Sequence, residues 1–181
     1  MFKRQKQAGF TIVELLIVIV VIGILAAITI VAFNGVTTKA ENTKTVNAVA
    51  AYSKAIAGYA AVNSAYPNFA YPCLGPSGTN CGNVTDNTGA CNFIGGTNYS
   101  GSFDTAIKTI ASALPGASTQ SMNCGGKSYG GAFYGSTDGK AATITYFLKG
   151  NVPCPSVSGL SSAGDYRNGD TTVCYNNLPT L

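Results

Sequence analysis

The N-terminal part of the chain is dominated by one long apolar run. Between residues 15 and 33 only Gly23 and Thr29 interrupt the apolar residues, and both do so weakly. A helix rises about 1.5 Å per residue, so this run is long enough to cross the ~30 Å hydrocarbon core of a membrane. The pattern predicts a membrane-directing helix close to the N-terminus.

Polarity rises sharply after the apolar run, and the pattern becomes that of an amphipathic helix. Apolar side chains recur there at spacings of three and four, with lysines off the stripe: Val49, Tyr52, Ile56 and Tyr59. Such spacing places them on one face of a helix. We predict one continuous helix over residues 11–63, which Pro67 ends. We expect the aromatic stripe to pack this helix onto its own sheet.

Residues 64–127 form a long connection that is rich in Gly, Asn, Thr and Ser. A second helical pattern lies inside it, carried by Phe103, Ile107, Ile110 and Leu114. Ser102 is the predicted N-cap of this short helix, and Pro115 with Gly116 predicts its end. A connection of this length needs to be pinned in a compact domain, and disulfides would pin it.

The C-terminal third has the alternation of β-strands. Two β-prone runs flank a Ser-Thr-Asp-Gly turn at residues 136–139, which predicts a hairpin. In the second run Ile144, Tyr146 and Leu148 alternate with Thr143, Thr145 and Phe147, as in a strand with one face on a helix. A last strand is expected over residues 171–175. The predicted fold is α+β, a long N-terminal helix packed on a small antiparallel sheet with disulfide-pinned loops.

Six cysteines follow the helix, and the chain contains no histidine. They are Cys73, Cys81, Cys91, Cys124, Cys154 and Cys174. An even number in a Gly- and Ser-rich region behind a membrane-directing segment predicts disulfides in an oxidising compartment. Histidine-dependent nucleophiles, metal sites and haem sites are excluded in their usual forms, so the sequence predicts a protein that is not an enzyme and needs no cofactor.

The formal net charge of +4 comes mainly from the first residues of the chain. Lys3, Arg4 and Lys6 precede the apolar run, and the remainder is nearly neutral. Non-specific electrostatic binding to the phosphates of a nucleic acid is therefore not supported, and no specific nucleic-acid site is expected. The positive-inside rule keeps these residues cytoplasmic and directs the cysteine-containing part outward.

Glu14 is a carboxylate at the edge of the apolar run, with no neighbouring cation in sequence. A cleaved secretory signal would need a shorter apolar run with a small-residue cleavage site. An uncleaved signal anchor would need no carboxylate there, and a charge at a membrane boundary is costly enough to suggest a function.

The N-terminal residues resemble the class III signal of type IV pilins and pseudopilins. The shared features are the basic leader "MFKRQKQAG", Phe10, and Glu14 as the fifth residue counted from Phe10, followed by the apolar run. The resemblance implies that a prepilin peptidase cuts between Gly9 and Phe10 and methylates the new N-terminus. The implied parts are a leader at 1–9, a membrane and filament-core helix at 10–34, its amphipathic half at 35–63, and a globular domain at 64–181.

The resemblance also implies roles in assembly for Phe10, Glu14 and Gly23. Glu14 of an incoming subunit would meet the terminal amine of Phe10 in a neighbour, which sets the axial register. Many family members have a proline inside the apolar helix where this chain has Val31. Local melting of the helix would then rest on Gly23 alone.

The implied function is that of a structural subunit of a type IV pilus. The subunit would sit in the cytoplasmic membrane as a single-pass precursor and then polymerise into an extracellular helical filament for adhesion, twitching motility or DNA uptake. The implied partners are the prepilin peptidase, an inner-membrane platform protein and an assembly ATPase. Two alternatives stay open: a pseudopilin of a type II secretion or competence system, and a membrane-anchored surface binding module.

The resemblance further implies that Cys154 pairs with Cys174 to close a C-terminal loop. The other four cysteines allow three pairings, and the sequence does not choose among them. Asp165, Asn168 and Asp170 could serve as calcium ligands. Turn-forming residues explain them equally well, and their spacing is not that of an EF-hand.

Overall fold

The computed structural model describes residues 9–75, 81, 100–118, 122–124 and 127–181. These residues fall into two compact units, Met1–Lys39 and Ala40–Leu181. One long helix, α1 (Ile12–Asn63), supplies most of the first unit and the N-terminal element of the second. The predicted continuous helix over residues 11–63 is confirmed.

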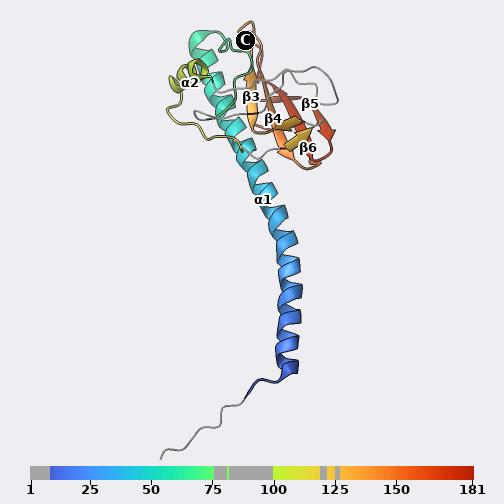
Figure 1. The fold of residues 1–181 in the computed structure, drawn as a ribbon. Coiled ribbons are helices and arrows are strands. Elements are labelled where there is room, and N and C mark those ends of the chain that lie inside the picture. Colours follow the sequence, from blue (N-terminus) through green and yellow to red (C-terminus); the bar gives the residue numbers. More distant parts are fainter. Residues whose placement is uncertain (1–8, 76–80, 82–99, 119–121, 125–126) are drawn as a thin grey trace, which may run out of the picture. The chain divides into compact units, whose positions relative to one another are not determined.

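The sheet of the second unit has four antiparallel strands (Figure 1). The strands are β3 (Ala132–Gly135), β4 (Thr143–Lys149), β5 (Ser161–Asn168) and β6 (Thr171–Asn177), in the spatial order β3-β4-β6-β5. The predicted hairpin is β3–β4, in which Phe133 lies opposite Thr145. The predicted last strand is β6, which pairs with the whole of β4. A separate two-stranded sheet joins β1 (Met122–Cys124) to β2 (Lys127–Tyr129).

Strand β5 corrects the sequence interpretation, which treated the segment between Cys154 and Cys174 as a loop. Its side chains are mostly polar and exposed, so it lacks the alternation that marks a half-buried strand. It forms because its backbone pairs with β6, and an irregularity between Ser162 and Gly164 interrupts the register. The strand lies at the edge of the sheet.

The opposite edge strand, β3, is partly covered by an extended segment that follows α1. Isolated bridges join Phe69 to Ser136 and Cys73 to Phe133. Between them Tyr71 adopts a positive φ of 58°, which is unusual for a bulky side chain. Its ring lies so close to Gly135 that a Cβ there would approach it to 2.9 Å.

The short helix α2 (Gly101–Lys108) differs from the prediction at both ends. Its N-cap is Ser100 instead of Ser102, because the Ser100 hydroxyl accepts the Phe103 N–H at 3.3 Å. The helix ends before Ile110, which is partly exposed. Phe103 and Ile107 are buried as expected, since they lie one turn apart on the same face.

The main core lies between α1, α2 and one face of the sheet. Val49, Tyr52 and Ile56 are buried in it, and Tyr59 packs against its margin, so the aromatic stripe packs onto the chain's own sheet as predicted. The sheet contributes Tyr134, Ile144, Tyr146, Leu148 and Cys174 to the same core.

The other face of the sheet is buried as well, which the sequence did not indicate. Phe133, Phe147 and Val173 form a second cluster there with Cys73 and Cys81. Partly buried tyrosines surround this cluster: Tyr71, Tyr166 and Tyr175. Strand β4 is therefore covered on both faces, and Phe147 is a core residue.

Candidate functional site

The candidate site in the first unit begins at the N-terminal turn of α1, where Thr11 and Glu14 bind each other. The Glu14 carboxylate accepts the Thr11 backbone N–H at 2.8 Å and the Thr11 hydroxyl at 2.7 Å. In return the Thr11 hydroxyl accepts the Glu14 N–H at 3.2 Å. This reciprocal arrangement is a capping box, which satisfies backbone donors that a helix start leaves unpaired.

The capping box has a sequence signature, Thr-x-x-Glu directly before an apolar run, which the interpretation of Glu14 as a charge at a membrane boundary overlooked. It gives Glu14 a local structural role in addition to its charge. Both residues are exposed in the single chain, so the carboxylate is accessible from outside the helix.

Apolar side chains cover the first half of α1 on all sides and remain exposed. Phe10 is 81% exposed and Ile17 57%, and Val21, the least exposed of the large side chains that the structure describes in this run, is 47% exposed. By length and composition α1 is able to cross a membrane. A helix that is apolar all round and uncovered requires lipid or other helices as its surroundings.

Gly9 and Phe10 precede the helix, and both are exposed. Gly23 lies inside α1, and among the described residues no atom outside the local helix backbone lies within 4 Å of the point where a Cβ would stand. Packing against these residues therefore does not require glycine at this position. In a helix interior glycine costs about 1 kcal/mol relative to alanine, so Gly23 locally weakens α1.

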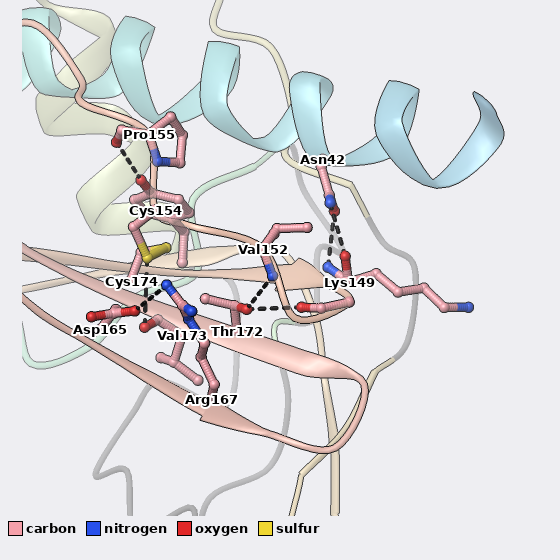
Figure 2. The surroundings of a disulfide bond; sticks show 12 residues. Asn42, Lys149, Val152, Cys154, Pro155, Asp165, Arg167, Thr172, Val173 and Cys174 are labelled. Carbon is pink, nitrogen blue, oxygen red and sulfur yellow. Dashed lines mark hydrogen bonds and ion pairs between the residues drawn. A yellow bond between two sulfur atoms is a disulfide. The ribbon is translucent and has the colours of Figure 1, made fainter. Parts of the chain in front are cut away.

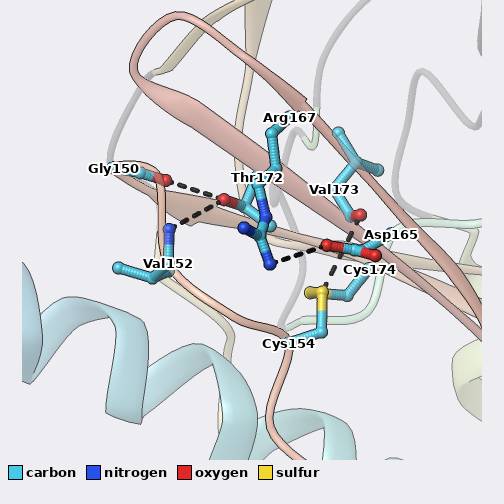
Figure 3. Close-up of polar contacts among 8 residues, drawn as sticks. All are labelled: Gly150, Val152, Cys154, Asp165, Arg167, Thr172, Val173 and Cys174. Atoms are coloured by element: carbon cyan, nitrogen blue, oxygen red, sulfur yellow. Dashed lines mark hydrogen bonds and ion pairs between the residues drawn. A yellow bond between two sulfur atoms is a disulfide. The ribbon is translucent and has the colours of Figure 1, made fainter.

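The second candidate region is the C-terminal loop closed by a disulfide between Cys154 and Cys174 (Figure 2). Cys174 is fully buried on β6, and Cys154 is partly buried. The Thr172 hydroxyl, also on β6, donates to the Gly150 carbonyl at 2.8 Å and accepts the Val152 N–H at 3.1 Å. Figure 3 shows these contacts beside the disulfide, which together fix the start of the loop on β6.

A second disulfide joins Cys73 to Cys81 in the cluster on the outer sheet face. Of the three pairings left open by the sequence, this one leaves Cys91 and Cys124 as the remaining cysteines. Cys91 lies outside the described residues. Of Cys124 the structure describes only its place in β1.

The two aspartates considered as calcium ligands lie near positively charged side chains of this chain instead. Asp165 pairs with Arg167 at 2.9 Å on β5 (Figure 3), and Asp170 lies 4.0 Å from Lys149. In the described part of the chain, no three His, Cys, Asp or Glu side chains come together in a way that could hold a metal ion. The geometry gives no support to a calcium site here.

Comparison with known proteins places the strongest similarity in the N-terminal region. Residues 4–30 match the family described as the prokaryotic N-terminal methylation motif, and these residues include Gly9, Phe10 and Glu14. Type II secretion system core protein G of Klebsiella michiganensis is 40% identical over 65 residues, which is 36% of this chain and 46% of that protein. The protein of the same name from Vibrio cholerae is 39% identical over 67 residues, or 37% and 46%. The chain thus spans less than half the length of these relatives.

A longer similarity reaches into the globular unit. Fimbrial protein Q of Moraxella bovis is 33% identical over 116 residues, which cover 61% of this chain and 70% of that protein. No solved structure matches the chain.

Proposed function

Given that this chain belongs to the family of type IV pilins and pseudopilins, whose members are structural proteins and not enzymes, we propose that it is a pilus subunit. Its N-terminal helix packs with those of neighbouring copies in the core of an extracellular filament. The main support is the exposure of the large apolar side chains that the structure describes in the first half of α1. Neighbouring helices would cover this surface after the subunit leaves the membrane.

Processing precedes assembly in this proposal. A prepilin peptidase removes residues 1–9 by cutting between Gly9 and Phe10, and Phe10 is then N-methylated. The exposure of both residues ahead of the helix supports access by the peptidase. The mature part then consists of the core helix at 10–34, its amphipathic half at 35–63, and the disulfide-bonded domain at 64–181.

Glu14 acts in assembly by pairing with the new terminal amine of Phe10 in a neighbouring subunit. Each of these charges alone would lose several kcal/mol of solvation in an apolar filament core, so they favour pairing. The capping box supports this role, because Thr11 holds the carboxylate at the first turn of α1. Gly23 provides the weak point at which the helix adjusts during assembly.

The charge of Glu14 is tested with Glu14→Gln and Glu14→Ala. The glutamine retains oxygen and nitrogen atoms near Thr11 but has no charge, whereas alanine removes both the charge and the two hydrogen bonds from Thr11 to the carboxylate. We expect both variants to be processed normally and to form filaments with at least a tenfold lower yield. Normal filament yields from Glu14→Gln would show that the charge is not required, and the proposed pairing would then be wrong.

Mass spectrometry of the mature chain tests the rest of the processing scheme. We expect an N-terminus at N-methyl-Phe10, and unreduced peptides that join Cys91 to Cys124. An intact N-terminal leader in the surface-exposed protein would instead favour a membrane-anchored binding module. The platform protein and the assembly ATPase are further proposed partners, which filament formation would require.

A pseudopilin of a type II secretion or competence system is the second candidate function. It is favoured by the similarity of the N-terminal residues to type II secretion system core protein G. The greater reach of the similarity to fimbrial protein Q favours the pilus. Electron microscopy and peptide analysis of sheared surface material distinguish the two, because only a pilus subunit forms long filaments that contain this chain.

A further inference from the structure

The side chain of Asn42 on α1 binds the backbone of Lys149 at the end of β4 twice (Figure 2). Its Nδ2 donates to the Lys149 carbonyl at 2.9 Å, and its Oδ1 accepts the Lys149 N–H at 2.9 Å. One amide side chain thus satisfies both polar groups of one residue of the sheet. The contact is partly buried, so these groups would be costly to leave unpaired.

Asn42 takes the place that a residue of β3 would otherwise take. The Phe147 N–H donates to the Gly131 carbonyl, just before β3 begins at Ala132. Two residues further along β4, the N–H and C=O of Lys149 point to the same side of the strand, past the end of β3. The helix side chain therefore continues the hydrogen bonding of the sheet where the neighbouring strand is missing.

Two neighbouring residues of α1 make further polar contacts with the segment that precedes β1. The Thr45 hydroxyl accepts the Ser118 N–H at 3.1 Å, and the Glu41 carboxylate accepts the Ser118 hydroxyl at 2.5 Å. We call Glu41, Asn42 and Thr45 the polar clamp. All three lie at the start of the part of α1 that belongs to the globular unit.

The apolar face of α1 that follows the polar clamp repeats nearly every seven residues. The repeated pairs are Ala48 and Ala55, Val49 and Ile56, and Tyr52 and Tyr59. Apolar packing is not directional, so the places of these three residues could also be filled in a second position shifted by seven residues, or about 10 Å along the helix. Asn63 and Pro67 would then take the places of the buried Ile56 and Ala60. In that position Ala55, Ile56 and Tyr59 would occupy the places of Ala48, Val49 and Tyr52.

The polar clamp does not take part in the repeat. After a shift of seven residues, Val49 would face the Lys149 backbone in place of Asn42, and Ala48 and Tyr52 would replace Glu41 and Thr45. None of these could reproduce all the hydrogen bonds of the clamp. We propose that the polar clamp, with Asn42 at its centre, specifies the register in which α1 docks on the sheet.

The docking register determines how many helix residues lie between the N-terminus and the first residue held by the globular unit. Asn42 is thus a positioning residue, and its role resembles that of a single polar residue that fixes the register of a coiled coil. The inference concerns contacts within the globular unit alone, so it does not depend on filament assembly.

The test is nuclear magnetic resonance of the full chain in detergent micelles, with Asn42→Val as the variant. The wild type should give one set of amide signals for residues 48–60, and a Lys149 amide that exchanges slowly with solvent. In Asn42→Val we expect two sets of signals for residues 48–60 and Lys149 exchange at least tenfold faster. Asn47→Val is the matched control, because Asn47 is exposed on the same helix, and it should behave as the wild type.

A single set of signals in Asn42→Val at wild-type positions would overturn the proposal, even if the variant were less stable. A residue that only stabilises the fold would lower the unfolding midpoint without creating a second register. If Asn42→Val does not fold, Asn42→Ala decides the question. It also removes both hydrogen bonds to Lys149 but is better suited to a helix than valine, so a single register in this variant would also refute the proposal.

Discussion

Opening the disulfide between Cys154 and Cys174 should reduce the stability of the globular unit by an amount that can be calculated from its loop. The substitution Cys154→Ala breaks the crosslink while it leaves the sulfur of the fully buried Cys174 in the core. The double variant Cys154→Ala/Cys174→Ala removes that sulfur as well. Comparison of the two variants separates loop closure from core packing.

The two cysteines are separated by 20 residues in sequence. Closing a loop of that length removes chain entropy from the unfolded state worth about 3 kcal/mol at 25 °C. The hydrogen bonds of Thr172 to Gly150 and Val152 do not need the disulfide, so the folded state should keep its structure. Removing the buried Cys174 sulfur should cost about 1 kcal/mol more, since it is comparable to deleting one buried methylene.

Urea unfolding of the full chain in micelles measures these losses through tyrosine fluorescence, since the chain has 10 tyrosines and no tryptophan. With a slope of about 2 kcal/mol per molar urea, a loss of about 3 kcal/mol shifts the midpoint by about 1.5 M. Ser156→Ala, at an exposed position in the same loop, should leave the midpoint unchanged. A loss below about 1 kcal/mol for Cys154→Ala at an unchanged slope would refute the loop-closure reasoning.

Two further predictions concern one buried and one partly buried tyrosine of the sheet. The Tyr134 hydroxyl donates to the Pro67 carbonyl at 2.7 Å, and the Phe69 N–H donates to the same carbonyl at 3.1 Å. Because the Phe69 bond remains in Tyr134→Phe, this variant should lose only about 1 kcal/mol of unfolding free energy in urea. A loss above about 3 kcal/mol would contradict this account. Burial, with a smaller effect from Tyr166, raises the pKa of Tyr175 from 10.0 to about 12. The folded state therefore holds this proton more tightly than the unfolded state, so stability is intact below pH 10 and is lost as the pH rises towards 12. Unfolding midpoints at increasing pH should fall less steeply in Tyr175→Phe, and an equally steep fall would argue against a contribution from Tyr175.

Elements with strong periodicity were predictable from the sequence. The helix α1 follows from its apolar run and its stripe of spaced apolar residues, and the β3–β4 hairpin follows from two β-prone runs around a turn. Strand β5 was not predictable in this way, because it is held by backbone pairing with β6 and carries little buried apolar surface. The pairing of β5 with β6 forms only when the chain folds, so the sequence of β5 alone does not reveal it.

Local chemistry was less well predicted than the elements that carry it. Ser100 and Ser102 are both good N-caps, and the choice depends on which hydroxyl meets the Phe103 N–H. The burial of Phe147 required knowledge of what covers the outer sheet face, including the Cys73–Cys81 disulfide. Asn42 gave no signal at all, since one polar residue at the margin of an amphipathic helix looks like part of its solvent-exposed side.

The two edges of the sheet bear on how this chain avoids aggregation at high concentration. An unpaired strand edge is a template for another chain, and proteins protect such edges with irregular registers, charges or covering segments. Here β3 is bridged by Phe69 and Cys73, while β5 combines a register irregularity with the exposed Asp165–Arg167 pair. Edge-to-edge growth of the sheets into amyloid-like aggregates is thereby disfavoured. Copies of the chain would then associate through side-chain surfaces. Such surfaces can select a particular partner, whereas the backbone groups of a strand edge pair with almost any strand.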